Sequence, residues 1–295
     1  MTSEPELHDI TIDPGAVFDA RSGLVLDGRL GVVAAMALEQ AGRWRAAGPE
    51  PIVIADIACD HAKLAAYLWQ HTRGMDVLIC AGDANPRPLL KAEATLHACG
   101  VPFELYSADD VELHTDKVAL MLSDGTSALQ SMPTALDAAK AGRLCVVIAG
   151  LGGEQIVQIM CRSALLGDPG VCWLLQPMSR AVALRGFLAQ NGFPAPEEQL
   201  ACTGGEDGEK PRWTYPLMRV SRTAAPGEPL TPLELAAGRD ILRRRPRGFD
   251  NYIRHLYNYY NKKVTALALL GESEPELQKL ADGLLAAMKE PPRPR

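Results

Sequence analysis

The middle of the chain alternates between continuous apolar runs and segments with helical periodicity. The run IVIADIA at 52–58 is rich in β-branched residues, which is typical of a strand buried on both faces of a sheet. A helical pattern follows it, and the same order recurs several times. The expected strands are IVIADIA, DVLICAGD at 76–83, KVALMLSDG at 117–125, LCVVIAGLGG at 144–153, VCWLLQP at 171–177 and RWTYPLMRV at 212–220. This alternation predicts an α/β protein with a doubly wound parallel sheet.

The two ends of the chain have different patterns. An acidic, polar lead-in comes first, and Asp27 is expected to cap a helix over 26–41. The composition shifts at SRTAAPGEPLTP, and only helical patterns follow, at 231–245, about 248–270 and 273–289. We therefore predict an N-terminal lead-in at 1–24, a sheet domain at 25–222 and a helical hairpin domain at 228–295.

Composition narrows the class of protein. The chain has 295 residues, 47% of them apolar, and a net charge of −6, which argues against a wholly basic nucleic-acid binder. The seven cysteines form no Cys-x-x-Cys pair, so we expect a reducing compartment and no metal site. The polar N-terminus does not resemble a signal peptide, and no apolar run approaches the roughly 18 residues of a membrane span. We expect a cytoplasmic monomer.

Polar or glycine-rich loops follow five of the expected strands. In doubly wound sheets, ligands bind beyond the carboxyl ends of the strands, near the point where the strand order reverses. The five loops are Asp56 to His61, Asp83, Ser123 to Gly125, Gly150 to Gly153, and Gln176-Pro177. Asp83, at the end of the second buried strand, is placed to accept two hydrogen bonds from a ribose diol. We therefore expect a ligand that contains a ribose.

The first loop lacks the glycines that a pyrophosphate requires. Ala58, Asp60 and Ala62 occupy those positions, and Asp60 would repel a phosphate. An acidic turn suits a ligand with an ammonium and a sulfonium, which favours S-adenosylmethionine over a nicotinamide dinucleotide. Three structural alternatives stay open. Asp60 could cap the following helix beside a hydrogen-bonded His61, Asp124 could serve turn geometry, and Gly150 to Gly153 could allow a helix and a strand to pack closely.

Taken together, these loops resemble one family. The matching segments are DIACDHAKL at 56–64, DANPRPL at 83–89, SDGTSAL at 123–129, VVIAGLGGEQIVQIM at 146–160 and LLQPMSRAVALRGFL at 174–188. They are similar to motifs of the bacterial tRNA adenine-22 N1-methyltransferases. The resemblance implies a Rossmann-like class I methyltransferase sheet with a C-terminal coiled-coil hairpin, S-adenosylmethionine as methyl donor and tRNA as acceptor.

The resemblance also guides the choice of candidate site residues. For the cofactor we name Asp56, Ala58, Cys59, Asp60, His61, Asp83, Ala84, Asp124, Gly125 and Gly150. For catalysis we name Asp60 and His61, which could relay a proton, and Gln176, which could orient the acceptor base. For the substrate we name Gly152, Gly153, Arg185, Arg243, Arg244, Arg245, Arg247, Lys262 and Lys263.

A basic segment near the C-terminus suggests RNA contact. Residues 238–263 carry eight lysines and arginines against Asp240 and Asp250, a net charge of +6. Four tyrosines are interleaved with them, and aromatic rings can stack on bases. The alternative is a solvated helix face whose tyrosines pack within the hairpin.

The chain departs from the family pattern at Ala58, where the family has glycine. Two other functions therefore stay open. One is a catalytically degenerate relative that binds RNA or S-adenosylmethionine. The other is an NAD-dependent oxidoreductase, which the sheet and Asp83 alone would also permit.

Overall fold

The computed structural model describes residues 17–19, 24–106, 113–204, 212–222 and 228–290. Most of the expected lead-in and the expected boundary at 223–227 lie outside these residues. Within the lead-in, β1 (Val17–Asp19) pairs antiparallel with β2 (Leu24–Leu26). The division into a sheet domain and a hairpin domain stays a prediction.

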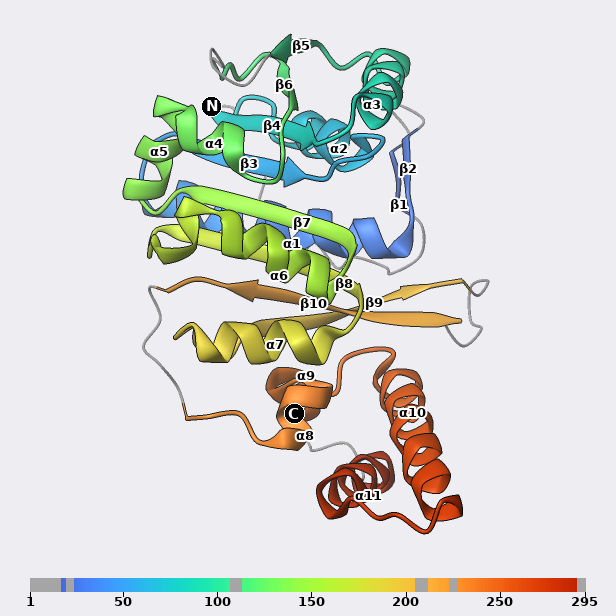
Figure 1. The fold of residues 1–295 in the computed structure, drawn as a ribbon. Helices are drawn as coiled ribbons and strands as arrows, with labels where there is room; N and C mark the ends of the chain where they lie inside the picture. The colour runs from blue at the N-terminus through green and yellow to red at the C-terminus, as the bar shows by residue number, and fades with distance from the viewer. Residues whose placement is uncertain (1–16, 20–23, 107–112, 205–211, 223–227, 291–295) are drawn as a thin grey trace.

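An eight-stranded sheet forms the centre of the described part (Figure 1). Its order is β5 (Phe103–Tyr106), β6 (Val118–Leu122), β4 (Val77–Asp83), β3 (Ile52–Ile57), β7 (Leu144–Gly152), β8 (Val171–Ser179), β10 (Trp213–Val220) and β9 (Glu197–Thr203). The strands from β5 to β8 pair in parallel, whereas β10 is antiparallel to both neighbours. The strand order reverses at β3, so the carboxyl ends of β3 and β7 flank the crevice where such sheets bind ligands.

Helices cover both faces of the sheet. One apolar cluster lies under α1 (Gly28–Ala47), α2 (Lys63–His71) and α3 (Pro86–Ala98). A second lies under α4 (Ser127–Ser131), α5 (Pro133–Lys140), α6 (Gly153–Arg162) and α7 (Ala181–Gln190), with the 3-10 turn η1 (Ala164–Gly167) after α6. The predicted α/β doubly wound fold is confirmed. Asp27 caps α1, because its carboxylate accepts a hydrogen bond from the Leu30 amide at 2.7 Å.

The C-terminal helices pack beyond the β9–β10 edge of the sheet (Figure 1). They are α8 (Pro232–Ala237), α9 (Arg239–Arg244), α10 (Phe249–Leu269) and α11 (Pro275–Lys289). A third apolar cluster joins them to Leu200 of β9. α10 and α11 form the expected hairpin.

Several details differ from the sequence prediction. The strands β1, β2 and β9 were not expected. The helical stretch between β6 and β7 is divided into α4 and α5 at Pro133, which lacks the amide that would continue the helix. The helix predicted at 231–245 divides at Gly238, whose φ is +91°. A Cβ there would lie 2.2 Å from Glu198 Oε2, so the close approach of this turn to β9 requires glycine.

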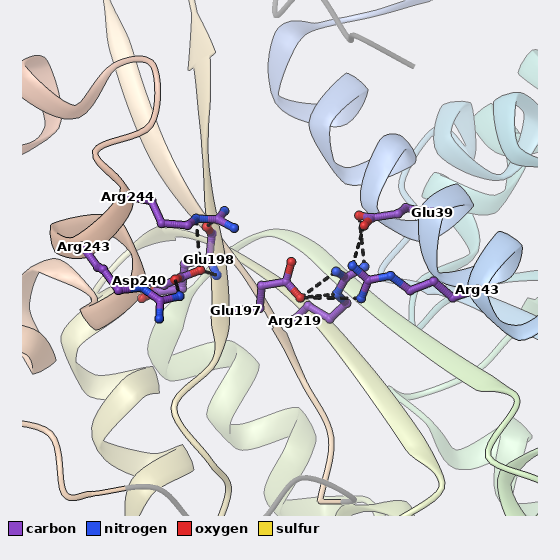
Figure 2. A network of polar contacts seen from close by, with 8 residues as sticks. All are labelled: Glu39, Arg43, Glu197, Glu198, Arg219, Asp240, Arg243 and Arg244. Carbon is purple, nitrogen blue, oxygen red and sulfur yellow. Dashed lines mark hydrogen bonds and ion pairs between the residues drawn. The ribbon is translucent and has the colours of Figure 1, made fainter. Parts of the chain in front are cut away.

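Two neighbouring glutamates on β9 hold different parts of the molecule (Figure 2). Glu197 accepts from Arg219 of β10 at 2.6 Å, and Arg219 also donates to Glu39 of α1 at 3.2 Å. Glu198 points the other way, because successive side chains of a strand lie on opposite faces. Its amide donates to Asp240 of α9 at 3.2 Å, and its carbonyl oxygen accepts from Arg244 at 2.9 Å.

Arg185 of α7 is a buried link between the sheet and the C-terminal helices. Its side chain is fully buried and pairs with the equally buried Glu198 at 2.8 Å. It also donates to the carbonyl oxygens of Leu235 and Ala236 and to the Tyr252 hydroxyl. The expectation that Arg185 binds substrate is therefore corrected, because all its donors are used inside the protein.

We expect Arg185→Ala to lower the free energy of unfolding by about 3–5 kcal/mol, because it leaves the buried Glu198 carboxylate without its cation. Urea unfolding measures the change, and Arg254→Ala on the exposed face of α10 is the matched control. The double variant Arg185→Met, Glu198→Leu should recover much of the loss. A double variant as unstable as the single one would contradict this account of the pair.

Candidate active site

The turn between β3 and α2 has an unusual backbone for a sequence without glycine. Ala58, Asp60 and Ala62 have φ values of +58°, +46° and +49°. The turn is fastened to the next strand by the Cys59 amide, which donates to the Gly82 carbonyl oxygen at 3.0 Å. Left-handed backbone costs a residue with a Cβ roughly 1–2 kcal/mol. Ala58, Asp60 and Ala62 therefore adopt a backbone conformation that glycine would adopt at lower cost.

Asp56, the fifth residue of β3, lies beneath this turn and is 5% exposed. Burial raises the pKa of its carboxyl from 3.8 to about 7, although Arg29 and the Ala65 amide oppose the shift. The hydrogen bond from Ala65 ties this carboxyl to the start of α2, directly after the turn. Cys59 is also buried, and burial raises the pKa of its thiol, which makes it a poor nucleophile.

Asp83 ends β4 and is 8% exposed. Its Oδ1 accepts a hydrogen bond from the Asn85 amide at 2.9 Å, and the described residues include no hydrogen-bond partner for Oδ2. The carboxylate is thus oriented by the following turn, while one oxygen is available at the carboxyl edge of the sheet. Ala84 follows it and is exposed.

Asp60 and His61 lie at the surface of the first turn. Their side chains are 61% and 44% exposed, and His61 Nε2 is 3.4 Å from Asp60 Oδ2. Both can therefore reach a ligand or exchange a proton with solvent. They stay candidates for both the cofactor and the catalytic role.

Gln176 of β8 connects the segments that meet at the crevice. Its Oε1 accepts from Arg29 Nη1 at 2.9 Å and from the Gly150 amide at 3.1 Å, and its Nε2 donates to the Pro177 carbonyl oxygen at 3.0 Å. The side chain is fully buried. The expectation that Gln176 orients the acceptor base is corrected, because its polar atoms position Gly150 and Arg29.

The glycines at the end of β7 and the start of α6 have separate roles. Gly150 has a φ of +84°, and a Cβ there would lie 3.3 Å from Arg29 Nη1. A Cβ at Gly153 would lie 2.4 Å from the Arg180 carbonyl oxygen, so this glycine allows the β7–α6 and β8–α7 turns to touch. Gly153 is buried for that reason, which corrects its expected substrate role. Gly152 is partly exposed beside Ser179 and remains a candidate.

Asp124 and Gly125 follow β6. Arg162 of α6 pairs with both Asp124 oxygens, at 3.1 and 3.3 Å, and both side chains are more than 60% exposed. A ligand amino group would compete with Arg162 for this carboxylate. Gly125 has a φ of +59° and lies against Ile159. The structure thus gives Asp124 a partner that the sequence did not reveal.

The basic residues expected to bind substrate divide into two groups. Arg245 donates to the Ala287 carbonyl oxygen at 2.6 Å and lies over the Phe249 ring. These contacts hold the end of α9 to α11, so the substrate role of Arg245 is corrected. The exposed residues are Arg243, Arg244, Arg247, Lys262 and Lys263, and Arg244 also donates to the Glu198 carbonyl oxygen at 2.9 Å.

Arg29 is the site residue that the sequence interpretation missed. It lies in the first turn of α1, 3.7 Å from Asp27, and reaches Gln176 and Gly150 across the crevice. Its side chain is 17% exposed. One sequence signal was available: an arginine two residues after a helix cap, on a helix that precedes the first buried strand.

No group of three metal-binding side chains occurs within the described ranges. Among the helices that the structure describes, none has the length and apolar character to cross a membrane.

The fold and the crevice define a class of protein. The family model of the methyltransferase domain matches residues 48–207, more than half of the chain, so the chain belongs to the methyltransferase domain family. This membership argues against the oxidoreductase alternative.

Particular relatives are more specific. A provisionally named tRNA methyltransferase of Mycoplasma pneumoniae is 27% identical over 211 residues, 71% of this chain and 78% of that protein. The B. subtilis m1A22 tRNA methyltransferase TrmK has a similar fold, with a TM-score of 0.58 at 20% identity, covering 90% of this chain and 97% of that one. M. capricolum TrmK, solved with S-adenosyl-homocysteine, gives a TM-score of 0.58 at 19% identity, over 89% and 97%.

We expect Ala58→Gly to raise the free energy of unfolding by about 0.5–1 kcal/mol. Glycine removes the strain energy of an alanine in a left-handed conformation. This gain exceeds the entropic cost that glycine adds by making the unfolded chain more flexible. Ala94→Gly, on the exposed side of α3, is the control and should cost about 1 kcal/mol in urea unfolding. If Ala58→Gly and Ala94→Gly lowered the free energy of unfolding equally, this would contradict the strain assigned to Ala58.

Asp56 should make stability depend on pH. Its folded pKa of about 7 exceeds 3.8, so the folded state binds an extra proton between these values and stability falls as pH rises through that window. The free energy of unfolding of Asp56→Asn, relative to that of the wild type, should therefore rise between about pH 4 and pH 7, by up to roughly 4 kcal/mol. Urea unfolding across this range measures the difference. Asp137→Asn, at the surface, should show no such trend, and a flat difference for Asp56→Asn would refute the assignment.

Proposed function

We propose that this chain transfers a methyl group from S-adenosylmethionine to N1 of an adenine in tRNA, with adenine 22 as the expected position. The observation that carries the proposal is the acidic, glycine-free turn at 58–62 beside Asp83. Membership of the methyltransferase domain family supports the reaction class. The names of the similar proteins, a tRNA methyltransferase and two TrmK enzymes, support the acceptor.

The residues at the crevice fit S-adenosylmethionine. The free Asp83 oxygen can accept from a ribose hydroxyl, and the exposed Asp60 carboxylate complements a positively charged ligand. A pyrophosphate would meet that same carboxylate with the wrong charge. When bound, S-adenosylmethionine supplies a methyl group on a positively charged sulfur.

Adenine N1 carries a lone pair, so the protein needs no strong base before the transfer. Its main task is to hold the acceptor ring at the methyl group, because orientation alone can supply much of the rate. We assign the Gly150–Gly152 end of β7 to this acceptor side of the crevice, where Gln176 Oε1 accepts a hydrogen bond from the Gly150 amide. A base within a paired region must first be extruded, at a cost of a few kcal/mol.

The transfer leaves the positive charge on the methylated adenine ring, whose 6-amino group can then release a proton. His61 and Asp60 are exposed at the mouth of the turn and 3.4 Å apart, which suits them to accept this proton and pass it to solvent. This role stays a proposal, as does RNA contact by the exposed Arg243, Arg244, Arg247, Lys262 and Lys263.

We expect Asp83→Ala to raise the Kd for S-adenosylmethionine by roughly 10–100-fold, because hydrogen bonds to a charged group contribute about 1.5–3 kcal/mol. Transfer of labelled methyl to a tRNA transcript should fall accordingly. Asp76→Ala is the matched control, since Asp76 immediately precedes the opposite end of the same strand, β4.

Two results would contradict parts of this proposal. Binding of S-adenosylmethionine without methyl transfer to any tRNA would support the catalytically degenerate alternative. Methyl transfer that is unaffected by Asp83→Ala would place the ribose elsewhere. Nucleoside analysis of the product distinguishes N1-methyladenosine from other methylated bases.

A further inference from the structure

A cleft of about 570 Å³ lies beside the candidate active site and is not used by the mechanism above. Its walls are the end of β8 and the start of α7 on one side, the start of β10 below, and α10 opposite. We call it the α10 cleft. It begins at Pro177, the residue after Gln176, so the two sites share a wall. Its volume is within the roughly 300–1,000 Å³ of typical ligand sites.

The chemistry of the α10 cleft is aromatic and cationic. Trp213 and Tyr259 are 49% and 45% exposed, a high value for large aromatic side chains. Arg180, Arg212 and Lys263 also line it. None of its described lining residues is an aspartate or a glutamate, although acids outnumber bases in the chain as a whole. A surface of this composition complements an anion that carries flat rings.

The walls of the α10 cleft are held in place. Asn251 of α10 donates to Thr214 of β10 at 3.0 Å, and Tyr252 accepts from the buried Arg185. Lys263 lies over the Tyr259 ring at 4.6 Å, and a hydrogen bond with Lys263 lowers the pKa of the Tyr259 hydroxyl. Among the described residues, the Arg180 side chain has one ion-pair partner, the exposed Glu154 at 3.9 Å, which a phosphate could replace. The cleft therefore needs little rearrangement to bind.

We infer that the α10 cleft holds one unstacked nucleotide of the acceptor RNA, next to the adenine that enters the active site. The base stacks on Trp213 and Tyr259, and Arg180, Arg212 and Lys263 meet the adjoining phosphates. This inference rests on the proposed function, because an adenine extruded toward Gly150 leaves its neighbour at the wall formed by Pro177.

The probe is a labelled tRNA transcript, whose affinity for the protein is measured by fluorescence anisotropy in the presence of S-adenosyl-homocysteine. We expect Trp213→Ala and Tyr259→Ala each to weaken RNA binding about tenfold, and Trp213→Phe to restore most of it, since base stacking tolerates any aromatic ring. Lys263→Ala should reduce the salt dependence of binding by about one ion, whereas Lys279→Ala on α11, 73% exposed, should change neither affinity nor salt dependence. S-adenosylmethionine affinity should stay at the wild-type value in every variant, which also shows that each is folded.

A second probe reports stacking directly. A short single-stranded RNA with a central 2-aminopurine should lose fluorescence on binding the wild type and not on binding Trp213→Ala, Tyr259→Ala. Wild-type RNA affinity in both aromatic variants, or an equal loss in Lys279→Ala, would overturn the inference. Binding of an unrelated basic or acidic peptide in place of RNA would overturn it too. If the wild type quenches the 2-aminopurine fluorescence but transfers no methyl group, nucleotide binding in the α10 cleft would be supported and the proposed reaction refuted.

Discussion

The buried ion pair between Arg185 and Glu198 determines how the two parts of the chain are combined. Arg185 lies on α7 and Glu198 on β9, and the same guanidinium reaches the carbonyl oxygens that end α8 and the Tyr252 hydroxyl of α10. Without it, Tyr252 of α10 would lose its buried hydrogen bond to α7, and this wall of the α10 cleft would lose one of its supports. Such a pair gives little net stability over an apolar pair, but it is intolerant of losing one partner. Its value here is to hold a basic, aromatic helix beside the carboxyl edge of the sheet.

The crevice at the centre of the sheet depends on a second polar contact of the same kind. Gln176 binds both Arg29 and the Gly150 amide, so it joins α1, β7 and β8 at the point where the strand order reverses. Asp83 and the 58–62 turn, which we propose for the cofactor, lie on β3 and β4, whereas the proposed acceptor side lies on β7 and β8. The α10 cleft lies beyond the end of β8. In the proposed arrangement, donor, target base and flanking nucleotide follow one another along the carboxyl edge.

The sequence predicted the sheet and the loops well, because buried parallel strands are continuous apolar runs and their loops are polar or rich in glycine. β9 was missed because Glu198 occupies an inward position between apolar ones, and an acid there hides the alternation unless Arg185 is known to face it. For the same reason, Arg185 and Arg245 were predicted to bind substrate and Gln176 was predicted to orient the acceptor base, although their partners lie far away in the sequence. Burial and long-range pairing decide such roles, and neither can be deduced from local spacing.

The central claim is that a turn without glycine, with Asp60 at its surface, binds a cationic ligand that contains no phosphate. Calorimetric titration of S-adenosylmethionine and of NAD into the wild-type protein tests it most directly. We predict micromolar binding of S-adenosylmethionine and no detectable binding of NAD. Binding of NAD in preference, or no binding of S-adenosylmethionine by the folded protein, would contradict the claim and show that the Ala58 methyl closes the turn to the cofactor.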